Sequence, residues 1–148
     1  MKTIIFTLAI ALLFSCTKEN VLPIPKQIET EYLAFLYHAQ KYGVKLKSNK
    51  LKGFILSGKL ETRPMFQGYY SNDTKIIYID TTSKAYIGNK ECFLFHELGH
   101  ALLRRSHNED FLENGESASV MNELLPKSYL QNKEYYLDEL FTKPDKSY

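Results

Sequence analysis

One short pattern constrains this chain more than any other: residues 96–100 are His-Glu-Leu-Gly-His. On an α-helix, His96 and His100 lie one above the other on the same face, about 6 Å apart along the axis. Two imidazoles in this arrangement can bind one Zn²⁺ ion. Glu97 follows the first histidine directly and is placed to hold a water molecule rather than the metal. The pattern therefore predicts a helix that carries a metal site with a base beside it.

The sequence around the motif supports a helix. Asn89 is a suitable N-cap residue, and Glu91 puts a carboxylate in the first turn, where the helix dipole favours an anion. We expect the helix to run from about residue 90 to residue 103 or 104. Gly99 has no side chain, which leaves room for helix packing or for a close neighbour.

A third histidine, His107, follows seven residues after the second. In an unbroken helix it would lie about 10.5 Å further along the axis than His100, too far for one Zn²⁺ ion to bind both. If His107 is the third ligand, the helix must end first and the chain must turn back at residues 104–106. Glu109, Asp110 or a carboxylate on a later segment are the alternative ligands.

The N-terminus has the features of an export signal. Lys2 precedes an uncharged apolar run over residues 4–14, which is too short to span a bilayer but has the length of a signal-peptide core. The run ends at Leu-Phe-Ser-Cys, which resembles the lipobox of bacterial lipoproteins. We therefore expect residues 1–16 to be a lipoprotein signal peptide and Cys16 to carry lipid. This predicts an exported protein anchored to a membrane of the bacterial cell envelope.

The rest of the chain is expected to form a tether over residues 17–25 and one domain over residues 26–148. The formal net charge of +2 gives no reason to expect nucleic-acid binding. With Cys16 lipidated, Cys92 has no disulfide partner, and we expect it to be a small buried residue rather than a ligand. We expect the protein to be a monomer.

Periodicity along the chain predicts an α+β fold. The predicted helices cover residues 27–42, ending at Gly43, and residues 132–141, with Tyr136, Leu137, Leu140 and Phe141 facing inward. The predicted strands cover residues 53–58, 65–70 and 75–80, with a turn at 71–73, a connection over 81–88 and a loop over 108–115. We expect a short twisted mixed sheet, packed on the N-terminal helix and the helix of the motif. His38, on the first helix, is expected to be structural or exposed.

The motif region resembles the metzincin clan of zinc peptidases, whose signature is HExxHxxGxxH followed by a tight turn with a methionine beneath the metal. Residues 119–122, Ser-Val-Met-Asn, resemble that Met-turn, so Met121 would form the floor of the site. The match is partial, because the clan's glycine position is Leu103 here and its third histidine position is Ser106. His107 comes one residue late, so we expect a loop one residue longer.

The resemblance implies a zinc-dependent endopeptidase with a small zincin-like fold. Three histidines would hold one Zn²⁺ ion, leave a fourth position open for water and lower the pKa of that water to about 7. Glu97 would be the general base that takes the proton as the water attacks a peptide carbonyl. A tyrosine could stabilise the oxyanion, and the candidates after the Met-turn are Tyr129, Tyr135 and Tyr136.

The resemblance also implies an edge strand that binds extended substrate. In the clan, a strand just before the active-site helix pairs with the peptide. This role falls on the predicted strand over residues 75–80, with Ile77, Tyr78 and Ile79 at its centre.

Two other interpretations remain open. In a gluzincin-type peptidase the third ligand would be a glutamate on a later helix, and the candidates are Glu116, Glu123 and Glu139. The chain could also be a non-catalytic lipoprotein that binds zinc at the cell surface. Glu97 argues against that second interpretation, because a structural zinc site needs no base and usually closes its fourth position with a Cys or His.

Overall fold

The structure is a computed structural model that describes residues 22–46, 51–58, 60 and 67–143. The predicted signal peptide, Cys16, residues 17–21 of the tether and the first two residues of the strand expected at 65–70 lie outside the described residues. The chain has a mixed α+β fold, as predicted. Within the described residues, no helix has the length and apolar character needed to cross a membrane.

Three strands form one sheet. They are β1 (Gly53–Ser57), β2 (Gly68–Ser71) and β3 (Ile76–Asp80), and their order in space is β1-β3-β2. β1 runs parallel to β3, whereas β2 runs antiparallel to it. Ile77 and Ile79 are fully buried on one face of the sheet, as the alternation of side chains along a strand requires.

The central position of β3 shows that its predicted role as the substrate edge was wrong. Ile77, Tyr78 and Ile79 have a paired strand on each side, so their backbone groups are not open to a peptide. β1 pairs with β3 although β2 lies between them in the sequence. Such a strand order is set by tertiary packing rather than by the local sequence. The edge strand that borders the histidines is β2.

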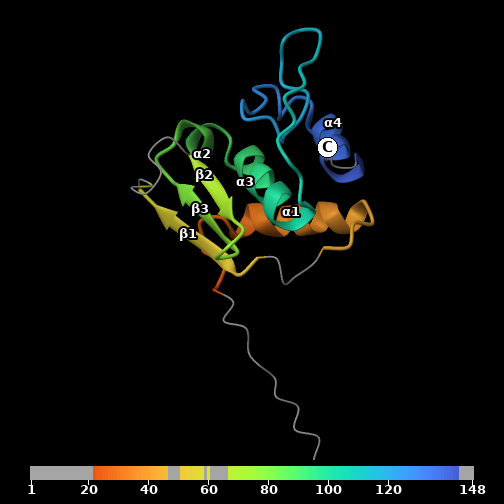
Figure 1. Cartoon of the computed structure of the whole chain (residues 1–148). Coiled ribbons are helices and arrows are strands. Elements are labelled where there is room, and N and C mark those ends of the chain that lie inside the picture. The colour runs from red at the N-terminus through yellow and green to blue at the C-terminus, as the bar shows by residue number, and fades with distance from the viewer. Residues whose placement is uncertain (1–21, 47–50, 59, 61–66, 144–148) are drawn as a thin grey trace, which may run out of the picture.

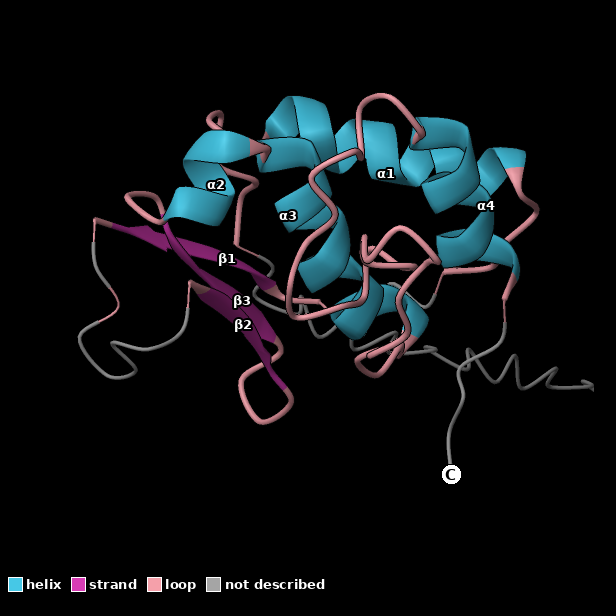
Figure 2. Ribbon diagram, turned by 90° about the horizontal axis from the view of Figure 1, so that it is seen from above, coloured by secondary structure: helices cyan, strands magenta, loops and turns pink. Residues whose placement is uncertain are grey.

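Four helical segments and one wider turn complete the fold. Their bounds are α1 (Glu29–Lys41), α2 (Lys84–Gly88), α3 (Lys90–Leu98), the π-helical turn η2 (Gly99–Leu103) and α4 (Lys133–Thr142). α3 lies between the sheet and α4, and α1 packs against both α3 and α4 (Figures 1 and 2). The helix with the histidine motif is therefore supported from three directions.

The predicted helices and the observed ones agree closely, with one exception. α1 and α4 match the segments expected at residues 27–42 and 132–141, and Gly43 follows α1 with a φ of 69°, the left-handed conformation of a C-terminal glycine. The short helix α2 was expected to be an irregular connection. The Ser83 hydroxyl caps it by accepting a hydrogen bond from the backbone N–H of Tyr86 at 3.2 Å. Five residues are too few to show a helical period.

Aromatic side chains hold the motif helix in the core. Phe35 of α1 packs edge to face on Phe95 of α3, with ring centroids 5.2 Å apart, and its ring lies 5.1 Å from Phe141 of α4. His38 lies beside the same rings, 6.2 Å from Phe95, as expected for a structural histidine. The residues of α4 that were predicted to face inward are all buried: Tyr136, Leu137, Leu140 and Phe141.

Candidate metal and active site

The helix that carries the motif ends in a widened turn. α3 begins at Asn89, whose side chain accepts a hydrogen bond from the backbone N–H of Cys92 at 3.1 Å, as predicted for the N-cap. After Leu98 the chain forms the π-helical turn η2, which holds more residues per turn than an α-helix. It ends at Arg104, which has a left-handed φ of 59°. The chain reverses direction there, within the segment predicted to turn.

The reversal brings His107 to the histidine pair. The Nε2 atoms of His96 and His100 are 3.1 Å apart, and the ring centroid of His107 lies 5.2 Å from that of His96 and 4.8 Å from that of His100. One ligand atom from each ring lies within 4.8 Å of the other two. These three histidines could therefore hold one metal ion.

Each of the three clustered histidines has a partner at Nδ1. His96 donates from Nδ1 to the carbonyl of Val120 at 2.8 Å, and His100 donates to the carbonyl of Arg105 at 2.6 Å. His107 Nδ1 lies 3.1 Å from a carboxylate oxygen of Glu123. These contacts orient the rings and leave Nε2 for a metal, which is the usual arrangement around metal-binding histidines. Burial, followed by the nearby His100, lowers the pKa of His96 to about 3, so its ring is neutral, as a ligand must be.

Glu97 is a buried carboxyl group beside the three histidines. Its side chain is 4% exposed, and its Oε2 atom has no hydrogen-bond partner within the described part of the chain. Burial alone raises the pKa of Glu97 to about 8. A buried polar atom without a partner is costly, and such atoms often mark functional sites. The carboxyl group lines the adjacent cleft, where a substrate or a water molecule would lie.

The three histidines and Glu97 lie where two cavities of about 560 and 550 Å³ adjoin. Both cavities are bordered by Gly68, His96, Glu97 and His107. We call the first the polar half of the cleft, because its other walls include Tyr69, Tyr70, Asn72 and Arg104. The second is the apolar half, with Ala85, Phe93, Leu124 and Leu125 in its walls.

The strand β2 runs along both halves of the cleft. Asp80 donates its backbone N–H to the carbonyl of Gln67 at 2.9 Å, so the alternation of an antiparallel ladder turns the backbone groups of Gly68 and Tyr70 away from β3. A Cβ atom at Gly68 would lie 2.5 Å from Phe93 and 3.1 Å from the Oε1 atom of Glu97. The glycine therefore allows the edge strand to pass directly over the carboxylate.

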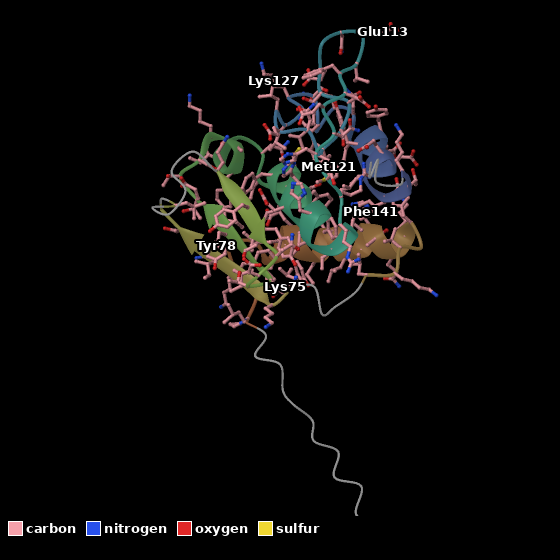
Figure 3. The ribbon with its side chains drawn as sticks, viewed as in Figure 1. Lys75, Tyr78, Glu113, Met121, Lys127 and Phe141 are labelled. Carbon is pink, nitrogen blue, oxygen red and sulfur yellow. The ribbon has the colours of Figure 1, made fainter. Side chains whose placement is uncertain are left out.

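Met121 lies in the core beneath the motif. It is fully buried beside α3 (Figure 3). The exposed loop that follows His107 extends away from this core, and Glu113 lies at its far end. The backbone N–H of Met121 donates to the hydroxyl of Ser119 at 2.9 Å, which fixes the turn. A Cβ atom at Gly99 would overlap the sulfur of Met121, so this methionine is the close neighbour for which the glycine leaves room.

We expect Gly99→Ala to lower the free energy of unfolding by about 1–3 kcal/mol, because the added methyl group forces Met121 away from the helix. Urea unfolding measures the change. Gly88→Ala is the matched control: it adds the same methyl group to another helical glycine that has no atom within 4 Å of a built Cβ. Equal stability of the two variants would contradict the proposed fit between Gly99 and Met121.

A buried arginine connects the turn after η2 to the rest of the domain. The guanidinium of Arg105 donates to the backbone carbonyls of Glu139, Leu140 and Lys143 at 2.9–3.1 Å and pairs with the Glu139 carboxylate at 2.8 Å. The other oxygen of that carboxylate accepts a hydrogen bond from Ser119 at 2.6 Å. One network thus joins the end of α4, the turn of Met121 and the residue whose carbonyl orients His100. Nothing in the local sequence distinguishes Arg105 from Arg104, and the network was not predicted.

The alternative third ligands lie elsewhere. Glu109 and Glu123 form an exposed group with His107 that does not include the first two histidines, and Asp110 belongs to neither group. Glu116 accepts hydrogen bonds from the backbone N–H groups of Lys127 and Ser128. Glu139 is held by Arg105. Cys92 is fully buried, and burial, with a smaller effect of the neighbouring Glu91, raises the pKa of its thiol to about 12.

None of the three tyrosines suggested as oxyanion donors borders the cleft. The hydroxyl of Tyr129 donates to Glu91 at 2.7 Å, that of Tyr135 to the carbonyl of Ala118 at 3.1 Å, and that of Tyr136 to the carbonyl of Ser117 at 3.0 Å. The tyrosines that do line the cleft, Tyr69 and Tyr70, come from β2. They precede His96 by 27 and 26 residues, whereas the predicted oxyanion donors all follow Met121.

Comparison of the chain with protein-family models, with curated proteins and with solved structures found no match.

Proposed function

We propose that the chain is a zinc-dependent endopeptidase that cleaves peptide or protein substrates. His96, His100 and His107 would hold the Zn²⁺ ion, and Glu97 would be the general base. One observation carries the proposal: three imidazoles converge beside a buried carboxylate that has an oxygen without a hydrogen-bond partner. We also propose that the protein is an exported monomer and that a lipid on Cys16 anchors it to a membrane.

The donor set fits zinc. Two nitrogen ligands at tetrahedral positions on Zn²⁺ are about 3.3 Å apart, close to the 3.1 Å between the Nε2 atoms of His96 and His100. Three imidazoles with one side open to a cleft match the pattern of catalytic rather than structural zinc sites. His107 is 39% exposed at its side chain and borders both halves of the cleft, so an open position would face the substrate.

The turn η2 supports the likeness to metzincins. Because a π-helical turn contains one residue more than an α-helical turn, it accounts for the position of His107, one residue later than in the clan's signature. The left-handed residue likewise falls on Arg104, one position after Leu103, where the clan has glycine. Met121 lies beneath the motif, as the floor of a zincin-type site would.

The chemistry follows from these positions. A Zn²⁺ ion held here would polarise the scissile carbonyl and lower the pKa of a water molecule to about 7. The same ion would favour the ionised form of Glu97, whose carboxylate would take a proton from the attacking water and deliver it to the leaving amine. The edge of the described sheet formed by β2 would bind the peptide by strand addition, with the backbone groups of Gly68 among its hydrogen-bond partners.

The test combines metal analysis with cleavage. We expect the soluble domain, starting at Thr17, to bind about one zinc ion and to cleave members of a peptide library until a chelator removes the metal. His107→Ala is expected to weaken zinc binding by about 10-fold or more. Loss of a residue that only orients a metal ligand already lowers metal affinity by about 10- to 100-fold, so loss of a ligand should cost at least as much. Chelator competition measures the affinity. His38→Ala, which removes the histidine outside the site, is the matched control.

The results separate the alternatives. Full zinc affinity in His107→Ala would exclude this histidine as a ligand and favour a gluzincin-type carboxylate. Protein that binds one zinc ion but cleaves no peptide in a broad library would favour the non-catalytic zinc-binding lipoprotein. Protein that binds no zinc would exclude the zinc peptidase and the zinc-binding lipoprotein alike.

A further inference from the structure

The polar half of the cleft contains one guanidinium group that has no ion-pair partner among the described residues. Its walls include Arg104 and Arg105, and Glu97 is the only carboxylate among the described residues that line it. The guanidinium of Arg105 is buried and bound to α4. Arg104, in contrast, is exposed and forms no ion pair with any residue in the described ranges.

The backbone fixes where Arg104 stands. It has a φ of 59°, a conformation that costs an ordinary L-residue roughly 1–2 kcal/mol and that glycine would adopt without strain. The next residue, Arg105, is anchored on both its backbone and its side chain. Arg104 therefore projects from a rigid turn beside the histidines, at the wall of a cleft that a substrate must enter.

Tyr70 lines the same half of the cleft as this arginine. Its register opposite Ile77 puts it on the face of the sheet that packs against the core and α3. Burial raises the pKa of Tyr70, and the positive charge of Arg104 lies close enough to offset part of that rise. An anionic side chain in this half would meet a guanidinium and be bordered by a phenol.

The direction of β2 determines which part of a peptide lies there. The chain enters β2 from Gln67, in the apolar half, and leaves it at Asn72, in the polar half. Antiparallel strand pairs are slightly more stable per residue than parallel ones, so we take an added peptide to run in the opposite direction. Its N-terminal part then lies in the polar half, and its C-terminal part lies in the apolar half.

We propose that Arg104 is a specificity residue that selects peptides with an Asp or Glu on the N-terminal side of the scissile bond. The inference rests on the proposed peptidase function and adds the substrate class. The acidic residue should lie within about four residues of the bond, because about four residues separate Gly68, which lies over Glu97, from Asn72, which follows β2. We place the scissile bond beside Gly68 and Glu97, which line both halves of the cleft.

The test uses zinc-loaded domain and matched peptides. Each peptide has Glu, Gln or Lys at one of the four positions before the scissile bond and is otherwise identical. We expect wild-type kcat/KM to be about tenfold higher for the best Glu peptide than for its Lys counterpart, the size of a modest, partly solvated charge interaction. In Arg104→Gln this ratio should fall to about one, and in Arg104→Glu the Lys peptide should be cleaved faster. Lys41→Gln, which removes an exposed cation on α1, should keep the wild-type ratio.

Several results would overturn the inference. One is equal cleavage of the Glu, Gln and Lys peptides by wild-type protein, and another is a Glu preference that survives Arg104→Gln. An Arg104-dependent preference on the C-terminal side of the bond would refute the antiparallel direction. If wild-type protein cleaves no peptide, the proposed function itself fails. The affinities of the same peptides, measured by fluorescence anisotropy with wild-type and Arg104→Gln protein, still decide whether Arg104 selects acidic residues.

Discussion

Glu97→Gln is expected to reduce peptide cleavage by about 10²- to 10⁴-fold while the protein still binds one zinc ion per chain. Glutamine has nearly the same shape as glutamate but cannot accept the proton of the attacking water. The carboxyl group is buried beside His96 and is not one of the grouped metal ligands, so its loss should leave the histidines in place. Values of kcat/KM, with the metal content of the same samples, measure both effects.

Glu113→Gln is the matched control for this experiment. It makes the same substitution at an exposed glutamate on the loop far from α3 (Figure 3), and it should retain wild-type activity. Cleavage by Glu97→Gln within tenfold of wild type would mean that another group is the base. Loss of zinc from this variant would mean that the carboxylate supports the metal rather than the reaction.

Arg105→Leu is expected to lower the free energy of unfolding by about 3–5 kcal/mol. The substitution leaves the buried Glu139 carboxylate with only the Ser119 hydroxyl as a side-chain hydrogen-bond partner among the described residues. It also removes the donors that satisfy three carbonyl groups at the end of α4. Urea or thermal unfolding, monitored by circular dichroism, measures the loss.

Arg104→Leu is the control, because it makes the same change at the adjacent, exposed arginine and should alter stability by less than about 1 kcal/mol. Arg105→Leu combined with Glu139→Leu should recover part of the stability, since the buried charge is then gone. Equal stability of the two single variants would show that the buried ion pair contributes little.

Local patterns in the sequence were sufficient to predict the main helices. The periodic apolar residues of α1 and α4 and the capping residue Asn89 of α3 all act within one or two turns of the chain. Local patterns could not predict the order of the strands in the sheet, because β1 pairs with β3 and not with β2, the next strand in the sequence. The expectation that residues 77–79 form an edge was wrong for this reason.

The candidate site divides in a similar way. The convergence of the three histidines could be predicted, because helix geometry and a nearby turn were enough to bring His107 within reach of His100. The groups that orient the rings could not, since the acceptors at His96 and His100 are backbone carbonyls, and any residue type provides a carbonyl. Gly68 and Tyr70 were missed because their contact with the motif exists only once the sheet has packed on α3.

The turn η2 has a consequence for how ligand spacing is compared between proteins. Adding one residue to a regular α-helix would rotate every later side chain by about 100°. Here the anchored Arg105 fixes the chain after the turn, and the hydrogen bond from its N–H to the carbonyl of Gly99 closes the widened ring, so the extra residue is absorbed locally. His107 therefore reaches the other two histidines although it follows His100 by seven residues. A sequence pattern with a rigid interval would overlook such a chain, and one that tolerates a single inserted residue after the second histidine would detect it.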